Sequence, residues 1–387
     1  MRLPLLIMYY RAVTDCIVVG ASFAGLACAT ALARAGARVT IAEKKADTGA
    51  KLHTTGILVR EVIDGVPLLR GLPPALVRRI DGVRLYAPNL RHVDLAAPGY
   101  YFLATDTPGL MRWLADRAVK SGAELRCGVG FRTAQPVADG FDLGAQLGRT
   151  RFLVGADGPS SRVAQALGLG RNRQFLAGIE HEYDGAVLAA PGFLHCFFDR
   201  RLMPGYIGWM VQGVHAVQVG LARRMRAAGA ADVKPAMAAL LTKIAAIADF
   251  RGSTPTSIRA GLIPCGGLVQ PLARPRALLV GDAAGLVSPV TAGGIHTALT
   301  HGFAAGDAIA GFLAGRSADP QREFIDSYPR FRLKRLLRLA FDRFQTDWAF
   351  NLALATPPMR WAASQVYFHR RTAVLESLGD ARRFEPR

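Results

Sequence analysis

The sequence predicts an α/β fold in which a parallel-sheet domain is interleaved with an antiparallel-sheet domain and followed by a helical C-terminal region. Two observations lead to this prediction. A buried strand, a glycine-bearing turn and an Ala- and Leu-rich helix stand near the start of the chain, at residues 15–36. Two more strand-and-glycine segments follow far downstream, around residues 154–162 and 279–295. Because stretches of alternating and turn-rich sequence separate these segments, we expect the two domains to be interleaved rather than end to end.

Each expected element rests on a local pattern. Short apolar runs predict buried strands, helical apolar spacing that ends at a glycine predicts helices, and alternation with Pro-Gly turns predicts an antiparallel meander. On these grounds we expect strands at 15–20, 38–43 and 277–280, helices at 24–35, 109–121, 235–250 and 294–311, a meander over 193–222, and a basic helical region from residue 321 onward.

Composition limits the classes of function. The 387 residues include 48 Lys and Arg against 29 Asp and Glu, which gives a formal net charge of +19. This excess favours anionic partners such as phosphates or acidic membrane surfaces, although a basic proteome or simple solubility explains it equally well. A nucleic-acid partner is not expected, because the basic residues are scattered and no nucleic-acid-binding signature occurs.

Cysteine usage and the chain start bear on location. The five cysteines are odd in number and lack C-x-x-C spacing, so we expect neither a disulfide framework nor a metal site, and a cytoplasmic location fits best. Residues 1–10 are apolar but short and lack a cleavage site, so we interpret them as an extension, or as a misplaced start with Met8 first. No run of 18 apolar residues occurs, so no membrane-spanning helix is expected.

The first glycine segment has the residue types of a dinucleotide-binding turn. Gly20, Ser22 and Gly25 occupy the places of G-x-G-x-x-G between a strand and a helix. The first glycine permits the tight turn, the last permits close packing of the helix, and the helix N-terminus offers N–H groups to a pyrophosphate. Glu43 ends the next strand, where an acid accepts ribose hydroxyls. The pattern predicts a dinucleotide, with FAD or NAD favoured over NADP.

The later glycine segments favour FAD over NAD. A fold that binds NAD alone has no use for a strand-Gly-Asp element more than 200 residues after the first turn. Asp282 follows the strand at 277–280, where its carboxylate is expected to accept a ribityl hydroxyl. Gly293, Gly294 and Ile295 open a helix whose N–H groups are expected to face the N1/O2 edge of the flavin, which becomes anionic on reduction.

These segments resemble the G-x-G-x-x-G, DG and GD fingerprints of glutathione-reductase-like flavoproteins of the aromatic-hydroxylase type. Within that group the chain is more similar to the geranylgeranyl reductase family. The family's third motif matches GDAAG at 281–285 with PVTAGGI at 289–295, whereas aromatic hydroxylases usually carry His in place of Gly285. PGYIGWMV at 204–211 resembles the family's P-x-G-Y-x-W-x-F strand, and IPCGG at 263–267 resembles its return to the cofactor domain. The resemblance covers about residues 14–310.

The resemblance implies a domain plan and a set of cofactor contacts. It implies a Rossmann-like FAD-binding domain from 14–60, 102–165 and 262–312, an antiparallel-sheet substrate domain from 61–101 and 166–261, and a C-terminal helical region at 313–387. The residues expected to contact FAD are Gly20, Ser22, Phe23, Ala24, Gly25, Glu43, Lys44, Lys51, Thr107, Asp157, Gly158, Gly281, Asp282, Pro289, Gly293, Gly294 and Ile295.

The chain departs from the family at two places. Thr107 stands where the family often has an arginine at the start of a helix, while Arg112 falls within the helix itself. The family's cysteine-bearing loop beneath the flavin is replaced by KLHTTG at 51–56. His53 and Thr55 are therefore the residues expected to take the place of that cysteine near the ring and to move protons, with a structural or phosphate-side role as the alternative for His53.

The predicted meander supplies the expected substrate-binding residues. These are His195, Phe197, Tyr206, Trp209 and Met210. Strand alternation puts Tyr206 and Met210 on one face and Trp209 on the other, so that one face covers the flavin. A buried core is the alternative for an aromatic strand. No second dinucleotide fingerprint occurs, so NAD(P)H or another donor, such as a redox partner protein, is expected to dock transiently.

The basic tail and the cofactor together predict the function. Residues 328–344 interleave arginines with large apolar residues, and further large aromatic residues follow up to residue 368. We therefore expect either peripheral contact with the inner membrane face through 328–370 or a helix packed on the body. The resemblance implies an FAD-dependent oxidoreductase that saturates C=C bonds of an isoprenoid or another apolar substrate. The alternatives are an FAD-dependent monooxygenase of an aromatic or polyketide-like molecule and a non-redox flavoprotein of the lycopene-cyclase type.

Overall fold

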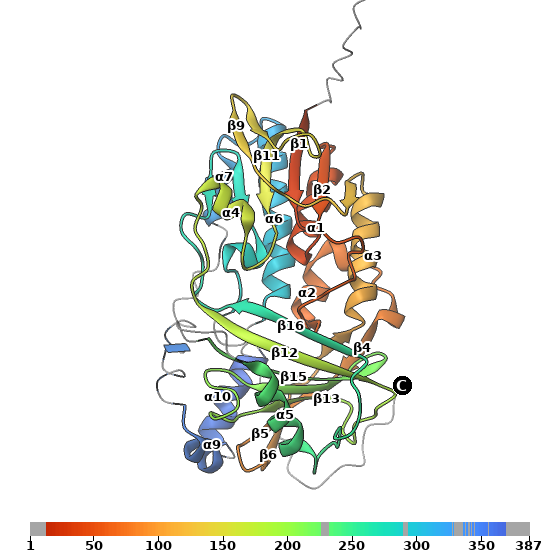
Figure 1. Cartoon of the computed structure of the whole chain (residues 1–387), viewed down its shortest axis with the longest axis vertical. Helices are drawn as coiled ribbons and strands as arrows, with labels where there is room; N and C mark the ends of the chain where they lie inside the picture. The colour runs from red at the N-terminus through yellow and green to blue at the C-terminus, as the bar shows by residue number, and fades with distance from the viewer. Residues whose placement is uncertain are drawn as a thin grey trace, which may run out of the picture.

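The fold is described from a computed structural model covering residues 13–225, 232–288, 293–326, 328, 336, 338–339, 341, 343, 345–354 and 356–368. Figure 1 shows two regions stacked along the long axis: a parallel sheet with its helices, and an antiparallel sheet with the C-terminal helices beside it. The mixed α/β fold and the helical C-terminal region confirm the predicted fold class. The exact division into domain segments stays a prediction.

The parallel sheet is built from strands that are far apart in sequence. Its order is β17-β18-β11-β1-β2-β8, with the hairpin β9-β10 on the edge of β11. The pairs among β18, β11, β1, β2 and β8 are parallel. The bounds are β1 Thr14–Val19, β2 Val39–Glu43, β8 Glu124–Cys127, β9 Gln135–Val137, β10 Gly140–Asp142, β11 Arg149–Gly155, β17 Ala273–Arg274 and β18 Ala277–Leu279. Because the carboxyl ends of parallel strands meet at one edge, all three glycine segments reach the same edge of this sheet.

Helices α1 (Phe23–Arg34), α3 (Thr107–Lys120) and α6 (Ile295–Leu313) belong to this region. Two glycines let α6 pack very closely on α1. A Cβ at Gly302 would lie 2.8 Å from the Cα of Ala24 and would overlap its carbonyl oxygen. A Cβ at Gly306 would lie 2.5 Å from the carbonyl oxygen of Cys28. Since the first and third glycine segments begin these two helices, this packing fixes the segments relative to each other.

The antiparallel region is a sheet in the order β16-β12-β15-β14-β13-β5-β6. The bounds are β5 Gly82–Tyr86, β6 His92–Ala96, β12 Phe175–Asp184, β13 Phe193–Phe197, β14 Gly208–Gln212, β15 Ala216–Arg224 and β16 Ser257–Pro264. The predicted meander is confirmed as β13 to β15, and the long strands β12 and β16 were not predicted. Helix α5 (Val233–Ile244) covers one face and ends six residues before the predicted end.

A small antiparallel sheet and short helices complete the described fold. The small sheet has the order β3-β7-β4, and the remaining elements are β3 Ile57–Val59, α2 Arg60–Gly65, η1 Pro67–Leu69, η2 Pro74–Leu76, β4 Val77–Ile80, β7 Phe102–Thr105, α4 Arg162–Leu167, η3 Gly281–Ala284, α7 Pro320–Asp326, α9 Asp347–Ala353 and α10 Pro357–Tyr367. No helix among the described residues is both long and apolar enough to cross a membrane.

Candidate functional site

The first glycine segment forms a tight turn between β1 and α1. Gly20 has φ +105°, and a Cβ on it would lie 2.5 Å from the carbonyl oxygen of Ala156. A Cβ on Gly25 would overlap the carbonyl oxygen of Gly20. Ser22 caps α1, because its Oγ accepts from the Gly25 N–H at 3.3 Å, and it donates to the Ala156 carbonyl at 3.0 Å. The turn is therefore locked both to its own helix and to the second glycine segment.

Glu43 ends β2 beside this turn. One carboxylate oxygen accepts from the backbone N–H of Ala21 at 2.8 Å, and the other accepts from that of Lys45 at 2.9 Å. The side chain is buried, whereas Lys44 is exposed. Phe23 and Ala24 are buried in the first turn of α1. Two backbone donors hold Glu43 at the carboxyl edge of the sheet, where the ribose of a dinucleotide is expected.

The second glycine segment follows β11. The Asp157 carboxylate accepts from the Ser161 hydroxyl at 2.6 Å and from the backbone N–H of Arg162 at 2.7 Å. These contacts hold the turn that leads into α4. Gly158 has φ +86°, and a Cβ added there would meet no atom within 4 Å. Asp157 thus organises the turn, while Gly158 leaves open space beside it.

The third glycine segment packs on the first. Gly281 has φ +59°, and its Cβ would lie 2.9 Å from the Cβ of Ala24. A Cβ on Gly294, which precedes α6, would lie 3.6 Å from Asp282 Oδ1. Burial raises the pKa of Asp282 to about 6. Burial is the cause of this shift, and among the described residues no hydrogen bond to the Asp282 carboxylate opposes it. Pro289 lies outside the described residues.

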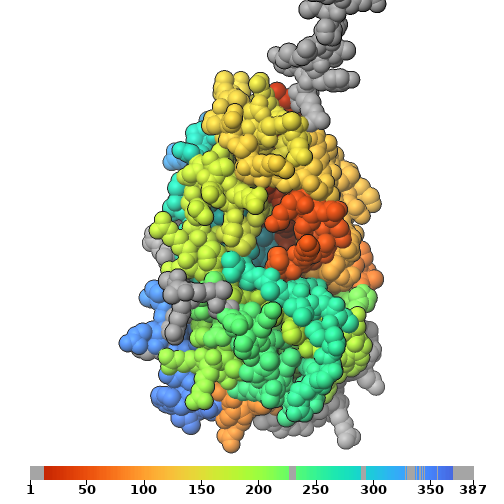
Figure 2. Space-filling model, in the orientation of Figure 1, coloured from red at the N-terminus to blue at the C-terminus, as the bar shows by residue number. Residues whose placement is uncertain are grey.

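These features fit FAD. The turns at Gly20 and Gly281 exclude side chains, and the N-terminus of α1 offers backbone donors. Two acids, the buried Glu43 and the half-buried Asp282, stand near the same sheet edge. Figure 2 shows the surface hollowed between the N-terminal segment, in red, and the yellow-green segment that follows β11. Carboxylates are suitable acceptors for ribose and ribityl hydroxyls, and a helix N-terminus is suitable for a pyrophosphate.

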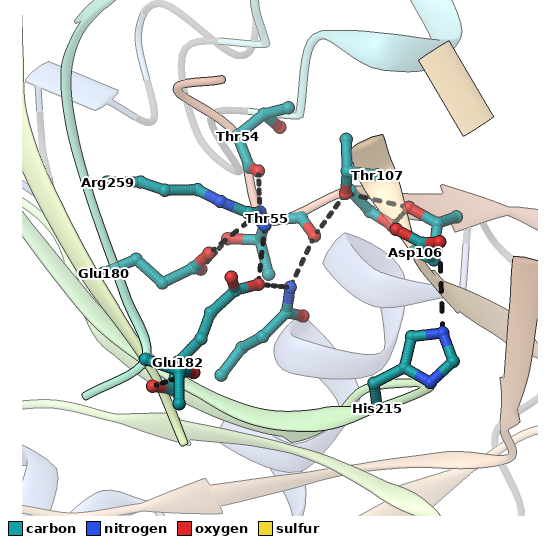
Figure 3. A network of polar contacts seen from close by, with 12 residues as sticks. Thr54, Thr55, Asp106, Thr107, Glu180, Glu182, His215 and Arg259 are labelled. Carbon is teal, nitrogen blue, oxygen red and sulfur yellow. Dashed lines mark hydrogen bonds and ion pairs between the residues drawn. The ribbon is translucent and has the colours of Figure 1, made fainter. Parts of the chain in front are cut away.

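The loop at 51–56 meets the antiparallel sheet through a buried polar network (Figure 3). The Thr55 hydroxyl and Trp209 Nε1 both donate to Glu180 Oε2, the latter at 2.8 Å. Arg259 Nη2 pairs with Glu182 Oε1 at 2.6 Å, while its Nη1 donates to the carbonyl of Thr54 at 3.1 Å. These interactions bind β12, β14 and β16 to the loop.

The other predicted residues near this loop have structural contacts. The Thr107 hydroxyl is buried, donates to the Thr55 carbonyl at 3.2 Å and lies where a Cβ on Gly56 would be. His53 is exposed, and its Nδ1 lies 2.6 Å from the carbonyl oxygen of Ala260 on β16. Lys51 is exposed with φ +48°. Thr107 therefore stabilises the loop through a buried contact with Thr55, and His53 links the exposed part of the loop to β16.

The five predicted substrate residues lie on both faces of the sheet. Met210 and Phe197 pack in the apolar cluster beneath α5. His195 is buried on a strand position paired with Met210, and its two ring nitrogens contact the Tyr86 hydroxyl at 3.0 Å and the Ala190 carbonyl at 2.9 Å. Burial lowers the pKa of His195. Both ring nitrogens of His195 therefore have hydrogen-bond partners within the antiparallel region.

Tyr206 and Trp209 lie on the opposite face from that cluster. Tyr206 joins an apolar cluster with Leu176, Ala222 and Cys265, and Trp209 packs against it. The Trp209 ring lies flat across β15, because a Cβ on Gly220 would lie 2.5 Å from its ring atoms. These two aromatic residues are therefore the predicted substrate residues that share a face with Glu180 and the 51–56 loop.

Sequence reasoning missed three features. Glu180 and Arg259 lie on β12 and β16, and their alternation with apolar residues was the signal that could have identified a half-buried polar face. Asn172 joins the second and third segments, since its amide donates to the carbonyls of Pro159 at 3.0 Å and Asp282 at 2.8 Å. Residues 168–174 and 266–271 enclose a groove of about 720 Å³ next to this joint.

Comparison with known proteins agrees with these features. The family model for an FAD binding domain matches residues 13–340. Digeranylgeranylglycerophospholipid reductase 2 of Methanopyrus kandleri is 29% identical over 320 residues, covering 76% of each chain. Digeranylgeranylglycerophospholipid reductase 1 of Methanothermobacter thermautotrophicus is 28% identical over 318 residues, covering 76% of this chain and 77% of that one.

Solved structures share the fold at lower identity. A geranylgeranyl bacteriochlorophyll reductase-like protein from Thermoplasma acidophilum aligns with a TM-score of 0.79 and 16% identity, over 92% of this chain and 97% of that one. A probable FAD-dependent monooxygenase from Pseudomonas aeruginosa aligns with a TM-score of 0.66 and 18% identity, over 89% of this chain and all of that one. The predicted resemblance to geranylgeranyl reductases is confirmed by these similarities.

Proposed function

The chain belongs to the FAD binding domain family, and from that premise we propose that it is an FAD-dependent reductase that saturates C=C bonds in the isoprenoid chains of a lipid. The observation that carries the proposal is the similarity to digeranylgeranylglycerophospholipid reductases over three quarters of the chain. The geometry supports it, because the strand with Trp209 touches the 51–56 loop through Glu180. Next to this network, Tyr206, Leu176 and Ala222 form an apolar cluster against which Trp209 packs, and such a surface suits a hydrocarbon chain.

The proposed cofactor contacts divide between the two ends of FAD. Gly20, Ser22, Gly25 and Glu43 would hold the ADP half, and Asp282 with Gly293 and Gly294 would hold the ribityl chain and flavin. Reduced FAD would supply hydride to one carbon of the double bond. The chain's own residues orient the substrate, since Tyr206 and Trp209 present an apolar surface and exclude water from it.

The electron donor and the location complete the proposal. NAD(P)H or another carrier reduces the flavin after transient docking. The protein acts in the cytoplasm, peripherally at the inner membrane face, where its lipid substrate resides. A monooxygenase acting on an aromatic molecule would need oxygen, and a cyclase would return a product of unchanged mass.

Product analysis tests the proposed reaction. Enzyme loaded with FAD is incubated anaerobically with dithionite and a detergent-solubilised glycerophospholipid that bears geranylgeranyl chains. We expect products heavier by two hydrogens for each saturated double bond, detected by mass spectrometry. Products that form only when air is admitted and gain an oxygen atom would show the monooxygenase instead, and isomers of unchanged mass would show the cyclase.

The C-terminal helices are the proposed membrane contact. Trp348 and Leu352, one turn apart on α9, are 67% and 72% exposed, and Trp361 on α10 is 67% exposed. Exposed tryptophans are typical of membrane interfaces, and the net charge of +19 favours anionic lipid. Most of the predicted arginine-rich stretch at 328–344 lies outside the described residues.

Vesicle binding tests this contact. We expect Trp348→Ser with Trp361→Ser to reduce co-sedimentation with anionic phospholipid vesicles about tenfold, because two large apolar groups leave the interface. Val119→Ser on α3, which removes an exposed apolar side chain away from the C-terminal helices, serves as the control. Equal sedimentation of the double variant and the unchanged protein would reject the membrane contact.

A further inference from the structure

Glu180 occupies an unusual position in the buried network. Its side chain is 5% exposed, and its Oε2 accepts hydrogen bonds from the hydroxyl of Thr55 and from Trp209 Nε1. Its other oxygen, Oε1, is buried and has no hydrogen-bond partner among the described residues. The carboxyl group thus contacts both a residue of the loop expected beneath the flavin and a residue of the expected substrate wall.

Burial favours the neutral form of Glu180, and the nearby positive charge offsets this only in part. Arg259 is the cation facing it from β16, and this guanidinium pairs at 2.6 Å with Glu182 but lies 3.6 Å from Glu180 Oε1. Gln218 on β15 also donates to Glu182, at 3.0 Å. Arg259 therefore faces two carboxylates of β12, Glu180 and Glu182, and its close ion pair is with Glu182. Burial raises the pKa of Glu180, and it outweighs the hydrogen bonds from Thr55 and Trp209 and the charge of Arg259, which all lower it.

We propose that Glu180 is the buried acid that supplies, through the Thr55 hydroxyl, the proton needed for double-bond saturation. This inference rests on the proposed function. The Thr55 hydroxyl is suited to relay the proton, because a hydroxyl both accepts and donates. Thr55 is half-buried, and its backbone carbonyl accepts hydrogen bonds from Thr107 and Gln218. Glu180 is a positioning residue in this scheme, while Thr55 meets the substrate.

The step balances in atoms and electrons. Bound reduced FAD would supply a hydride to one alkene carbon, with its own oxidation and the breaking of the π bond. Thr55 gives its hydroxyl proton to the other carbon, which forms the second C–H bond, and takes the carboxyl proton of Glu180. The resulting Glu180 carboxylate regains a proton from solvent after the product leaves. Arg259 stabilises that carboxylate during the interval.

Single-turnover kinetics tests the proton route. Anaerobic, reduced enzyme is mixed with geranylgeranyl-bearing glycerophospholipid in detergent, and flavin oxidation is followed. We expect Glu180→Gln to slow oxidation about 100-fold or more, a loss typical of general acids. Thr55→Val should lose a similar factor, while Thr55→Ser, which keeps the hydroxyl, should stay within about threefold. Full activity in Glu180→Gln, or equal losses in the valine and serine variants, would overturn the proposal.

The pH profile separates proton supply from a purely structural role. The rate of flavin oxidation should fall as pH rises through the pKa of Glu180, because the carboxyl loses its proton. The Glu180→Gln variant should not show this fall in rate. Trp209→Phe removes a hydrogen bond that stabilises the charged form of Glu180, so it should move the fall in rate to higher pH. A pH dependence of the rate that is unchanged in both variants would contradict the role proposed for Glu180.

A measurement on FAD-free protein distinguishes failure of this inference from failure of the proposed function. Infrared difference spectra against pH should show the C=O band of a buried protonated carboxyl that disappears in Glu180→Gln and persists in Glu182→Gln. Asp282→Asn identifies the separate contribution of Asp282. If the unchanged protein shows this band but saturates no double bond, the proposed function fails while the protonated Glu180 stands. Absence of the band at pH values above 4.5, the ordinary pKa of a glutamate, would overturn the inference itself.

Discussion

Replacing Gly25 by valine is expected to abolish useful FAD binding. Any Cβ at this position overlaps the carbonyl oxygen of Gly20 and lies 3.1 Å from the Cβ of Ala156, so the turn between β1 and α1 must open. Overpacking of this kind costs about 1–3 kcal/mol of stability. Because the same turn presents backbone donors to the pyrophosphate, we expect the FAD dissociation constant to rise at least ~100-fold, equivalent to about 2.8 kcal/mol.

Flavin fluorescence titration and thermal unfolding measure both effects of Gly25→Val. Gly192→Ala is the matched control, since a Cβ there meets no atom within 4 Å and the position has an ordinary φ. Its unfolding free energy should change by about 0.5 kcal/mol or less. Retention of FAD affinity within threefold in Gly25→Val would show that the first glycine turn does not hold the cofactor.

Replacing Asp282 by asparagine is expected to stabilise the FAD-free protein and weaken the complex. Burial raises the pKa of Asp282 from 3.8 to about 6. An acid whose pKa is raised by folding binds more protons in the folded state, so its contribution to stability is lost as pH rises from about 4 through 6. A shift of about two units corresponds to a penalty of ~3 kcal/mol at pH 8. Asparagine does not ionise and avoids that penalty.

Unfolding of the FAD-free protein at pH 4 and pH 8 tests the sign of this effect. The variant should gain up to ~3 kcal/mol at pH 8 and nothing comparable at pH 4. Its FAD affinity should fall about 10- to 100-fold, because a charged acceptor for a ribityl hydroxyl is lost. Asp64→Asn, at a carboxylate 59% exposed on α2, is the control and should show neither change. A gain that is equal at both pH values would contradict the burial of a titrating carboxylate.

The glycine segments were predictable because their function is local. Gly20 and Gly281 come just after apolar strands that the sequence displays directly, and Gly25 lies in the first turn of the helix that follows Gly20. All three are needed for backbone turns or close packing. The order of the strands was not predicted; the structure brings the segments together because the carboxyl ends of parallel strands lie at one edge. The tight contact between α6 and α1 depends on Gly302 and Gly306, which lie in an apolar helix without any turn signal.

The polar network was not predictable, because it depends on pairing between strands distant in sequence. Glu180 and Arg259 are brought together by the antiparallel register of β12 and β16, where they are directly paired. Strand alternation also failed for Tyr206, because β14 begins at Gly208 and leaves Tyr206 outside the pleat. Tyr206 therefore shares a cluster with Trp209 rather than with Met210. Packing against elements that are distant in sequence therefore determined where Glu180, Arg259 and Tyr206 lie.

The most direct test of the central claim is anaerobic reoxidation of the reduced flavin by an isoprenoid lipid. Enzyme with FAD reduced stoichiometrically is mixed, without oxygen, with a glycerophospholipid bearing geranylgeranyl chains, and the flavin absorbance and products are measured together. We expect one flavin oxidised for each double bond saturated, and no reoxidation by the fully saturated lipid. A flavin that stays reduced until oxygen enters, with no saturated product, would contradict the account.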